Sequence, residues 1–256
     1  MEEKKSTLFY EDSGGKGVPV VLLHGYPLDH SIWNSIIPLL KSTRVIAPDL
    51  RGMGHSPVLT GTATMRDMAE DIAYLLDSLQ IEQAVIVGHS MGGYVALAFA
   101  HAFPHRLLGL GLVATQARPD STEGRQARLK SAEEVSRKGV KVVAEAMLPK
   151  LTVREDVSSA ISDIILRTHP MGIMSVLRGM AEREDAQEWL SEITVPTVVV
   201  AGSQDLLMPL DRSKEMVRLL NRAWLVEIPN AGHMPMMEEP QAVADAILAL
   251  LQKIPF

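Results

Sequence analysis

The chain contains no cysteine. This absence excludes a disulfide framework, a zinc site built from thiolates and a cysteine nucleophile. Basic residues are also in the minority, because 25 lysines and arginines face 31 aspartates and glutamates, and the formal charge is −6. Such a chain has no bulk electrostatic attraction for nucleic acid. Its longest apolar runs, such as Tyr94–Ala100 and Leu107–Ala114, fall well short of the roughly 18 residues that cross a bilayer.

Recognition motifs for cofactors are missing too. The first predicted strand is followed by neither G-x-G-x-x-G nor G-x-x-x-x-G-K-[ST], and the sequence contains no H-E-x-x-H. We therefore expect no nucleotide cofactor and no metal. Residues Met1–Ser6 are polar and charged, with no apolar targeting segment behind them. The expectation is a cytoplasmic protein that uses neither a membrane nor nucleic acid.

What the chain does contain is an alternation of strand-like and helix-like segments. Apolar runs bounded by turn residues predict strands buried on both faces, and apolar residues at helical spacing predict the segments between them. The predicted strands are Ser6–Tyr10, Val18–Leu23, Arg44–Ala47, Ala84–Val87, Leu107–Val113, Val195–Ala201 and Ala223–Ile228. The predicted helices are Ile32–Leu40, Met65–Leu79, Met91–Phe103, Leu210–Leu220 and Pro240–Leu251. This order predicts an α/β fold with a mostly parallel central sheet flanked by helices.

One long segment breaks the alternation. Residues 116–188 show helical patterns and no convincing strand. We interpret them as a helical cap inserted after the fourth clear strand, with residues 1–115 and 189–256 as the core domain. The early cap, 116–150, holds eight basic and five acidic residues. That excess could receive a carboxylate substrate or an acidic carrier protein, but charge pairs such as Glu133 and Arg137 favour a solvated helix face.

The strongest chemical signal is the segment Gly88-His89-Ser90-Met91-Gly92-Gly93. It lies between a predicted buried strand and a predicted helix. A serine in that position forms a strained turn that raises its hydroxyl above the carboxyl edge of the sheet, and small flanking residues let the backbone pass close to its neighbours. A serine hydroxyl is a weak nucleophile, so the motif predicts a histidine base and an orienting acid elsewhere.

Two loops supply candidates for these partners. Asp205 follows the strand Val195–Ala201, and His233 follows the strand Ala223–Ile228. Carboxyl ends of parallel strands share one sheet edge, so we expect Ser90, Asp205 and His233 to meet there as a catalytic triad. Rival acids are Asp120, and Asp211, which we expect inside the following helix.

An oxyanion hole is needed for a tetrahedral intermediate. We expect its donors to be the backbone N–H of Met91 and that of Tyr26, in the loop after the first buried strand. His24 in the same loop is a rival base, which we interpret as structural because His233 already fills that role.

With these residues in view, the chain resembles the α/β-hydrolase fold superfamily over essentially its full length. The resemblance rests on Leu23–Pro27, Asp49–Ser56, the turn around Ser90, Gly202–Asp205 and Gly232–His233. It implies that Asp49 and Arg51–Ser56 form a structural turn, and that residues 116–188 roof the active site. Segments Leu22–Trp33 and Pro170–Arg183 are similar to small esterases, 3-oxoadipate enol-lactonases and cofactor-free perhydrolases. A serine nucleophile argues against the dehalogenases and epoxide hydrolases of this fold, which use aspartate.

The expected function is therefore a serine hydrolase that cleaves carboxylic esters or lactones of a small, largely apolar substrate through an acyl-enzyme. Aromatic residues make up only 4% of the chain, whereas methionines number 14, so methionines are the candidates for a flexible pocket. The predicted pocket residues are Trp33, Met147, Met174, Met208 and Met234, with ordinary core filling as the alternative. Two other functions stay open: a carbon–carbon bond hydrolase with the same triad, or a weakly hydrolytic small-molecule receptor. Perhydrolysis is a plausible side activity, and no protein partner is indicated.

Overall fold

The computed structural model describes residues 7–254. Residues 1–6 and 255–256 lie outside it, and with them the polar start of the chain and the first residue of the strand predicted at Ser6–Tyr10. The strand found near that position, β1, covers Tyr10–Asp12.

The described residues form one sheet of seven strands in the order β1-β3-β2-β4-β5-β6-β7. The strands after β1 are β2 (Val18–Leu23), β3 (Thr43–Pro48), β4 (Ala84–His89), β5 (Leu107–Val113), β6 (Thr197–Gly202) and β7 (Ala223–Ile228). Only β1 runs antiparallel to its neighbour, and the other pairs are parallel. The predicted α/β fold with a mostly parallel sheet is confirmed.

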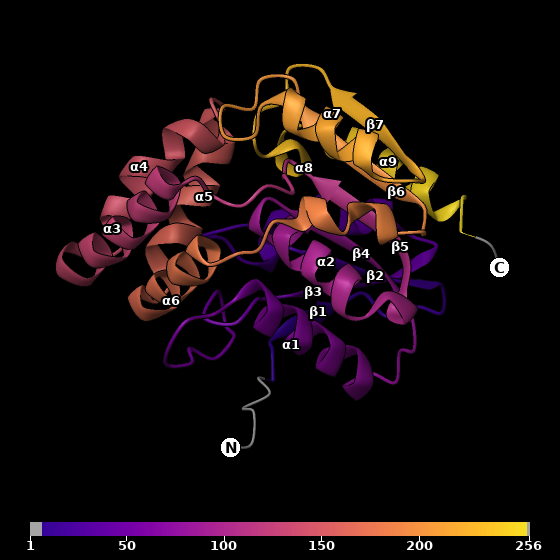
Figure 1. The fold of residues 1–256 in the computed structure, drawn as a ribbon, viewed down its shortest axis with the longest axis horizontal. Helices are drawn as coiled ribbons and strands as arrows, with labels where there is room; N and C mark the ends of the chain where they lie inside the picture. The colour runs from indigo at the N-terminus through magenta and orange to yellow at the C-terminus, as the bar shows by residue number, and fades with distance from the viewer. Residues whose placement is uncertain (1–6, 255–256) are drawn as a thin grey trace.

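Helices cover this sheet and bury its central strands. The helices α1 (Met65–Ser78), α2 (Met91–Ala102), α7 (Leu210–Leu219) and α9 (Pro240–Leu251) lie along it (Figure 1). Helix α2 contacts β2, β4 and β5, while α9 contacts β5 and β6. Strands β4 and β6 are buried along their whole length. A strand covered on both faces needs apolar residues at successive positions, which is why these strands read as continuous apolar runs.

One predicted helix is wrong. Residues 32–40 do not form a helix but contribute to two short 3-10 turns, η1 (His30–Trp33) and η2 (Ile37–Leu39). Pro38 lies at the start of η2. Proline has no N–H to donate to the preceding turn and its ring crowds that turn's carbonyl, so one continuous helix cannot pass through this position. Another 3-10 turn, η3 (Pro104–Arg106), connects α2 to β5.

The segment between β5 and β6 is helical, as predicted. It contains α3 (Thr122–Lys138), α4 (Lys141–Leu151), α5 (Glu155–Arg167) and α6 (Pro170–Ala181), followed by η4 (Ala186–Glu188) and η5 (Leu190–Glu192). The four helices gather at one end of the sheet, at the left of Figure 1. Glu133 and Arg137 form an ion pair whose side chains are 66% and 71% exposed, so that part of α3 is a solvated helix face. Treating residues 116–188 as a separate cap domain stays an interpretation.

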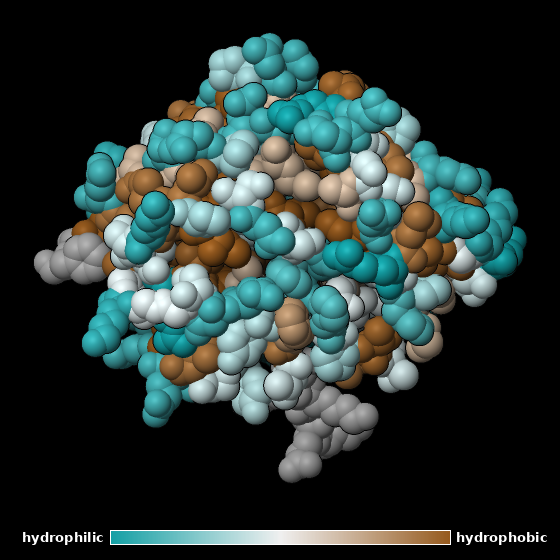
Figure 2. All heavy atoms as spheres, turned by 180° about the vertical axis from the view of Figure 1, so that it is seen from behind, coloured by the Kyte–Doolittle hydropathy of each residue, from teal (hydrophilic) through white to brown (hydrophobic). Residues whose placement is uncertain are grey.

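The surface seen from behind carries apolar patches separated by polar side chains (Figure 2). Among the described residues, no helix combines the length and the apolar character that a membrane crossing requires.

Candidate active site

The turn around Ser90 has the strained geometry that its sequence predicts. Ser90 follows β4, precedes α2 and has a φ of 51°. A Cβ added to Gly88 would lie 2.1 Å from the Gly92 carbonyl oxygen, so only glycine fits at position 88. The Ser90 N–H donates to the Val113 carbonyl oxygen at 2.9 Å, and the Thr115 hydroxyl donates to the Ser90 carbonyl at 2.7 Å. These contacts hold a backbone conformation that a serine rarely adopts by itself.

Ser90, Asp205 and His233 come together at the carboxyl edge of the sheet. His233 Nε2 lies 2.9 Å from Ser90 Oγ, and His233 Nδ1 lies 2.8 Å from Asp205 Oδ2. The side chains of His233 and Asp205 are 2% and 1% exposed. The other oxygen of Asp205 accepts the backbone N–H groups of Leu207 and Met208 at 2.8 and 2.9 Å. The two N–H groups and the imidazole together hold the Asp205 carboxylate, and in this arrangement His233 Nε2 is placed to accept a proton from Ser90 Oγ.

The rival residues are engaged elsewhere. Asp211 lies in the first turn of α7 with its side chain 94% exposed, and Asp120 is held by two arginines of the helical segment. His24 is buried, and its Nε2 accepts the Leu50 N–H at 2.9 Å while its Nδ1 lies 2.9 Å from the Gly25 carbonyl. Burial lowers the pKa of His24, so this neutral imidazole ties the β2 loop to the end of β3. These contacts agree with its structural interpretation.

The two predicted oxyanion donors flank Ser90. The Met91 N–H is at the start of α2. Tyr26 follows Gly25, whose backbone packs so closely on Ser90 that an added Cβ would lie 3.1 Å from Ser90 Cβ. Tyr26 and Met91 are both buried, and the Tyr26–Pro27 peptide bond is cis. Their role as oxyanion donors stays a prediction.

Two residues that the sequence analysis missed hold the histidine loop. His89 Nε2 lies 2.8 Å from the His233 carbonyl oxygen, and burial holds the pKa of His89 well below its usual range. Glu238, in the short helix α8 (Pro235–Glu238), accepts the Gly232 N–H and the Thr152 hydroxyl, each at 2.6 Å. No sequence signal marks His89, because it occupies a freely variable position of the serine motif. Glu238 and Glu239 directly follow the apolar run Met234–Met237, and nothing in the sequence singles out Glu238 from its neighbour.

The five predicted pocket residues differ in burial. Trp33 and Met234 are fully buried, which fits both a pocket wall and ordinary core filling. Met208 is 8% exposed and reaches the site through its backbone N–H on Asp205. Met147 and Met174 are partly buried against the hydrophobic core, and their part in a pocket stays a prediction.

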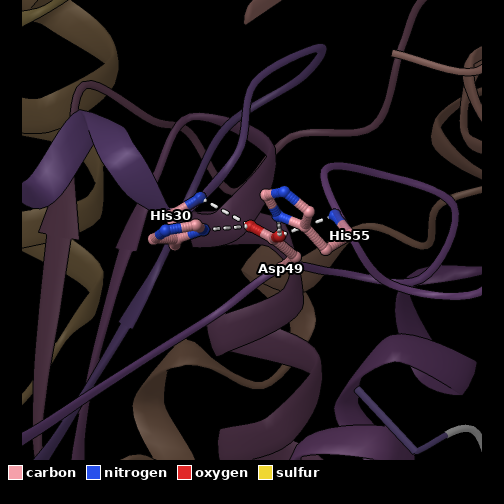
Figure 3. Close-up of side chains that lie close together, drawn as sticks. All are labelled: His30, Asp49 and His55. Carbon is pink, nitrogen blue, oxygen red and sulfur yellow. Dashed lines mark hydrogen bonds and ion pairs between the residues drawn. The ribbon is translucent and has the colours of Figure 1, made fainter. Parts of the chain in front are cut away.

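The described residues that could hold a metal ion are His30, Asp49 and His55. In Figure 3 both imidazoles point at the carboxylate between them, with Nδ1 to oxygen distances of 2.7 Å for His30 and 3.2 Å for His55. The backbone N–H groups of both histidines also donate to it at 2.8 Å. Burial opposes ionisation of Asp49, but these hydrogen bonds outweigh it and lower the pKa of the carboxyl. Four donors already satisfy this carboxylate, as a structural turn requires.

Comparison with known proteins extends this picture to the whole chain. Residues 18–240 match the family model described as the alpha/beta hydrolase fold. A thermophilic esterase from Thermogutta terrifontis, solved with malate bound, is 42% identical, with a TM-score of 0.94 over 97% of this chain and 94% of that one. A pimeloyl-[acyl-carrier protein] methyl ester esterase of Pectobacterium carotovorum is 29% identical over 96% of this chain and 99% of its own. A 3-oxoadipate enol-lactonase of Acinetobacter baylyi is 28% identical over 92% and 89%. The chain belongs to the α/β-hydrolase fold family.

Proposed function

We propose that the protein hydrolyses carboxylic esters or lactones through Ser90, His233 and Asp205. One observation carries the proposal: a single imidazole lies within hydrogen-bond distance of both the serine hydroxyl and a buried carboxylate. That is the geometry an activated serine nucleophile needs. The esterase and enol-lactonase relatives support this reaction class.

The proposed reaction begins when Ser90 Oγ attacks the ester carbonyl and His233 Nε2 takes its proton. Asp205 holds the imidazole in the tautomer that accepts this proton and stabilises the imidazolium that results. The N–H groups of Tyr26 and Met91 stabilise the oxyanion. His233 then returns the proton to the leaving alkoxide, which departs as the alcohol. Water, activated by the same imidazole, releases the acid from acyl-Ser90.

The test is hydrolysis of p-nitrophenyl esters of graded acyl length, together with methyl esters and a lactone. Ser90→Ala is expected to lower kcat by about 10⁴-fold or more. Asp205→Asn should also lower kcat strongly, whereas Asp211→Asn is the matched control, because it changes an exposed acid outside the site, and should retain wild-type turnover.

Other results would decide against the proposal. Full activity in Ser90→Ala would remove the serine from the mechanism. A folded wild-type protein that turns over no ester or lactone would exclude the proposed reaction. Cleavage of a diketone-type substrate would then indicate carbon–carbon hydrolysis, and saturable binding without turnover would indicate a receptor.

A further inference from the structure

An unbalanced charge cluster lies in the helical segment next to the proposed active site. Asp120 is paired with both Arg128 of α3 and Arg183, which follows α6. Arg128 donates from Nε and Nη2 to its two oxygens, and Arg183 Nη1 lies 2.8 Å from Oδ1. Two guanidinium groups therefore share one carboxylate. The cluster keeps an excess of one positive charge, and all three side chains are at least three-quarters buried.

The two arginines differ in how well they are satisfied. Arg183 also donates to the carbonyl oxygens of Arg118, at 3.0 Å, and Met180, at 3.1 Å, and only 4% of its side chain is exposed. Arg128 is 24% exposed, and its Nη1 faces the Met180 sulfur at 3.4 Å. A thioether is a weak acceptor. The excess charge thus belongs to Arg128, whose Nη1 edge lacks a strong partner among the described residues.

A second polar group beside this cluster also lacks a hydrogen-bond partner among the described residues. The Tyr94 hydroxyl is buried without a hydrogen-bond partner among the described residues. The Tyr94 ring lies under the Arg183 guanidinium, 4.4 Å from ring centre to carbon, and Arg183 shares the Asp120 carboxylate with Arg128. A buried hydroxyl normally has a partner, and its lack indicates a place where a ligand or water completes the site.

Tyr94 connects this cluster to Ser90. Tyr94 is on α2 one helical turn after Ser90, and its N–H lies 3.3 Å from the Ser90 carbonyl oxygen. Tyr26 follows the glycine that packs against Ser90 Cβ. One helical turn spans about 5.4 Å along the backbone, so the Tyr94 side chain leaves the helix beside Ser90. We infer that one small molecule reaches both Ser90 and the Tyr94–Arg128 cluster.

We propose that Arg128 and Tyr94 form a subsite for a carboxylate carried by the substrate. The preferred substrates are then half-esters of short dicarboxylic acids, or lactones with a carboxylate side chain, rather than purely apolar esters. A carboxylate would accept from the Arg128 Nη1 edge and from the Tyr94 hydroxyl, neutralise the excess charge and satisfy both donors. This inference rests on the proposed ester hydrolysis and specifies its substrate class.

The test compares two esters that differ in terminal charge: the mono-p-nitrophenyl ester of glutaric acid and p-nitrophenyl pentanoate. Wild type is expected to favour the anionic ester by about 10- to 100-fold in kcat/KM, the range of one or two charge-assisted hydrogen bonds. Arg128→Met should abolish this preference, and Tyr94→Phe should reduce it several-fold. Arg137→Met is the matched control on the same helix, because Arg137 is 71% exposed in a surface ion pair, and should keep the wild-type ratio.

A direct binding measurement separates the subsite from the reaction. Glutarate should inhibit pentanoate hydrolysis competitively in wild type, and should raise Tm in Ser90→Ala but not in Arg128→Met. Equal kcat/KM for both esters, with a ratio that neither variant changes, would overturn the subsite and leave ester hydrolysis standing. If the protein hydrolyses neither of the two esters and no lactone, the proposed function itself is overturned. If Arg128→Met does not fold, Tyr94→Phe decides, because removing an unpartnered hydroxyl should not destabilise the protein.

Discussion

Glu238 links three parts of the chain, and its replacement tests how the histidine loop is held. The carboxylate is 5% exposed. It accepts the Gly232 N–H, directly before His233, and the Thr152 hydroxyl from the connection between α4 and α5. In Glu238→Ala both donors lose their partner in a site with little water. An unsatisfied buried donor costs about 1–3 kcal/mol, and the cavity adds to this. We expect the free energy of unfolding to fall by about 3–5 kcal/mol.

Glu238→Gln distinguishes hydrogen bonding from charge. The glutamine oxygen can still accept the Gly232 N–H, and its NH₂ group can donate to Thr152 Oγ1, since a hydroxyl both donates and accepts. Both contacts survive in neutral form, so the expected loss is about 1 kcal/mol. Urea unfolding followed by tryptophan fluorescence measures both variants. On the proposed mechanism, Glu238→Ala should also lower kcat, because the loop before His233 loses its anchor.

The results have a clear order, with Thr152→Val as an intermediate variant that removes one of the two hydrogen-bond donors to Glu238. Stability should fall from wild type through Glu238→Gln and Thr152→Val to Glu238→Ala. Equal losses in Glu238→Gln and Glu238→Ala would show that the negative charge, rather than the hydrogen bonds, holds the loop. An unchanged midpoint in Glu238→Ala would refute the reasoning outright.

Three further variants test the geometry around the serine. Ser90→Gly should exceed Ser90→Ala in free energy of unfolding by about 1 kcal/mol, because glycine relieves the positive φ of 51°; equal urea midpoints would contradict this. Gly88→Ala places a methyl 2.1 Å from a backbone oxygen and should cost about 3 kcal/mol or more. Gly109→Ala, whose methyl would meet a flexible leucine side chain at 3.3 Å, is its control and should cost about 1 kcal/mol or less. His89 has a lowered pKa because it is buried, so the unfolded chain binds a proton near pH 6.5 that the native state does not. Its contribution to stability is complete above about pH 6.5 and falls by about 1.4 kcal/mol per pH unit below it. His89→Gln should reduce the slope of unfolding free energy between pH 6 and 5 by that amount, and an unchanged slope would show that His89 is charged in the native state.

Much of the fold follows from local pattern. A strand covered on both faces is apolar throughout, so β2 and β5 have the same bounds in sequence and structure. Ser90, Asp205 and His233 could be placed because each lies just beyond a strand end, and parallel strands bring such loops to one edge. Residues 32–40 have apolar residues at helical spacing, but Pro38 prevents a continuous helix there.

The support around the site could not be predicted in the same way. His89 contacts the backbone of a residue 144 positions later, and Thr152 meets Glu238 across 86 positions. Such pairs depend on how loops from different strands pack, and no periodicity encodes them. Trp33 illustrates the same limit. Its sequence allows either a pocket wall or a buried anchor, and its complete burial fits both, so its part in a pocket stays a prediction.

The position of the helical segment has a consequence for how such a chain can diversify. Leu110–Val113 pair directly with Thr197–Val200, so the sheet closes across the two points where the segment leaves and returns. The length of the segment then changes mainly the entropic cost of loop closure. Each doubling of a flexible connection adds only about 0.6 kcal/mol to that cost. Insertions or deletions among these helices would leave every strand pairing intact, provided that Thr152 stays in place to donate to Glu238. The residues that contact the substrate from these helices can therefore change in evolution while Ser90, Asp205 and His233 keep their positions.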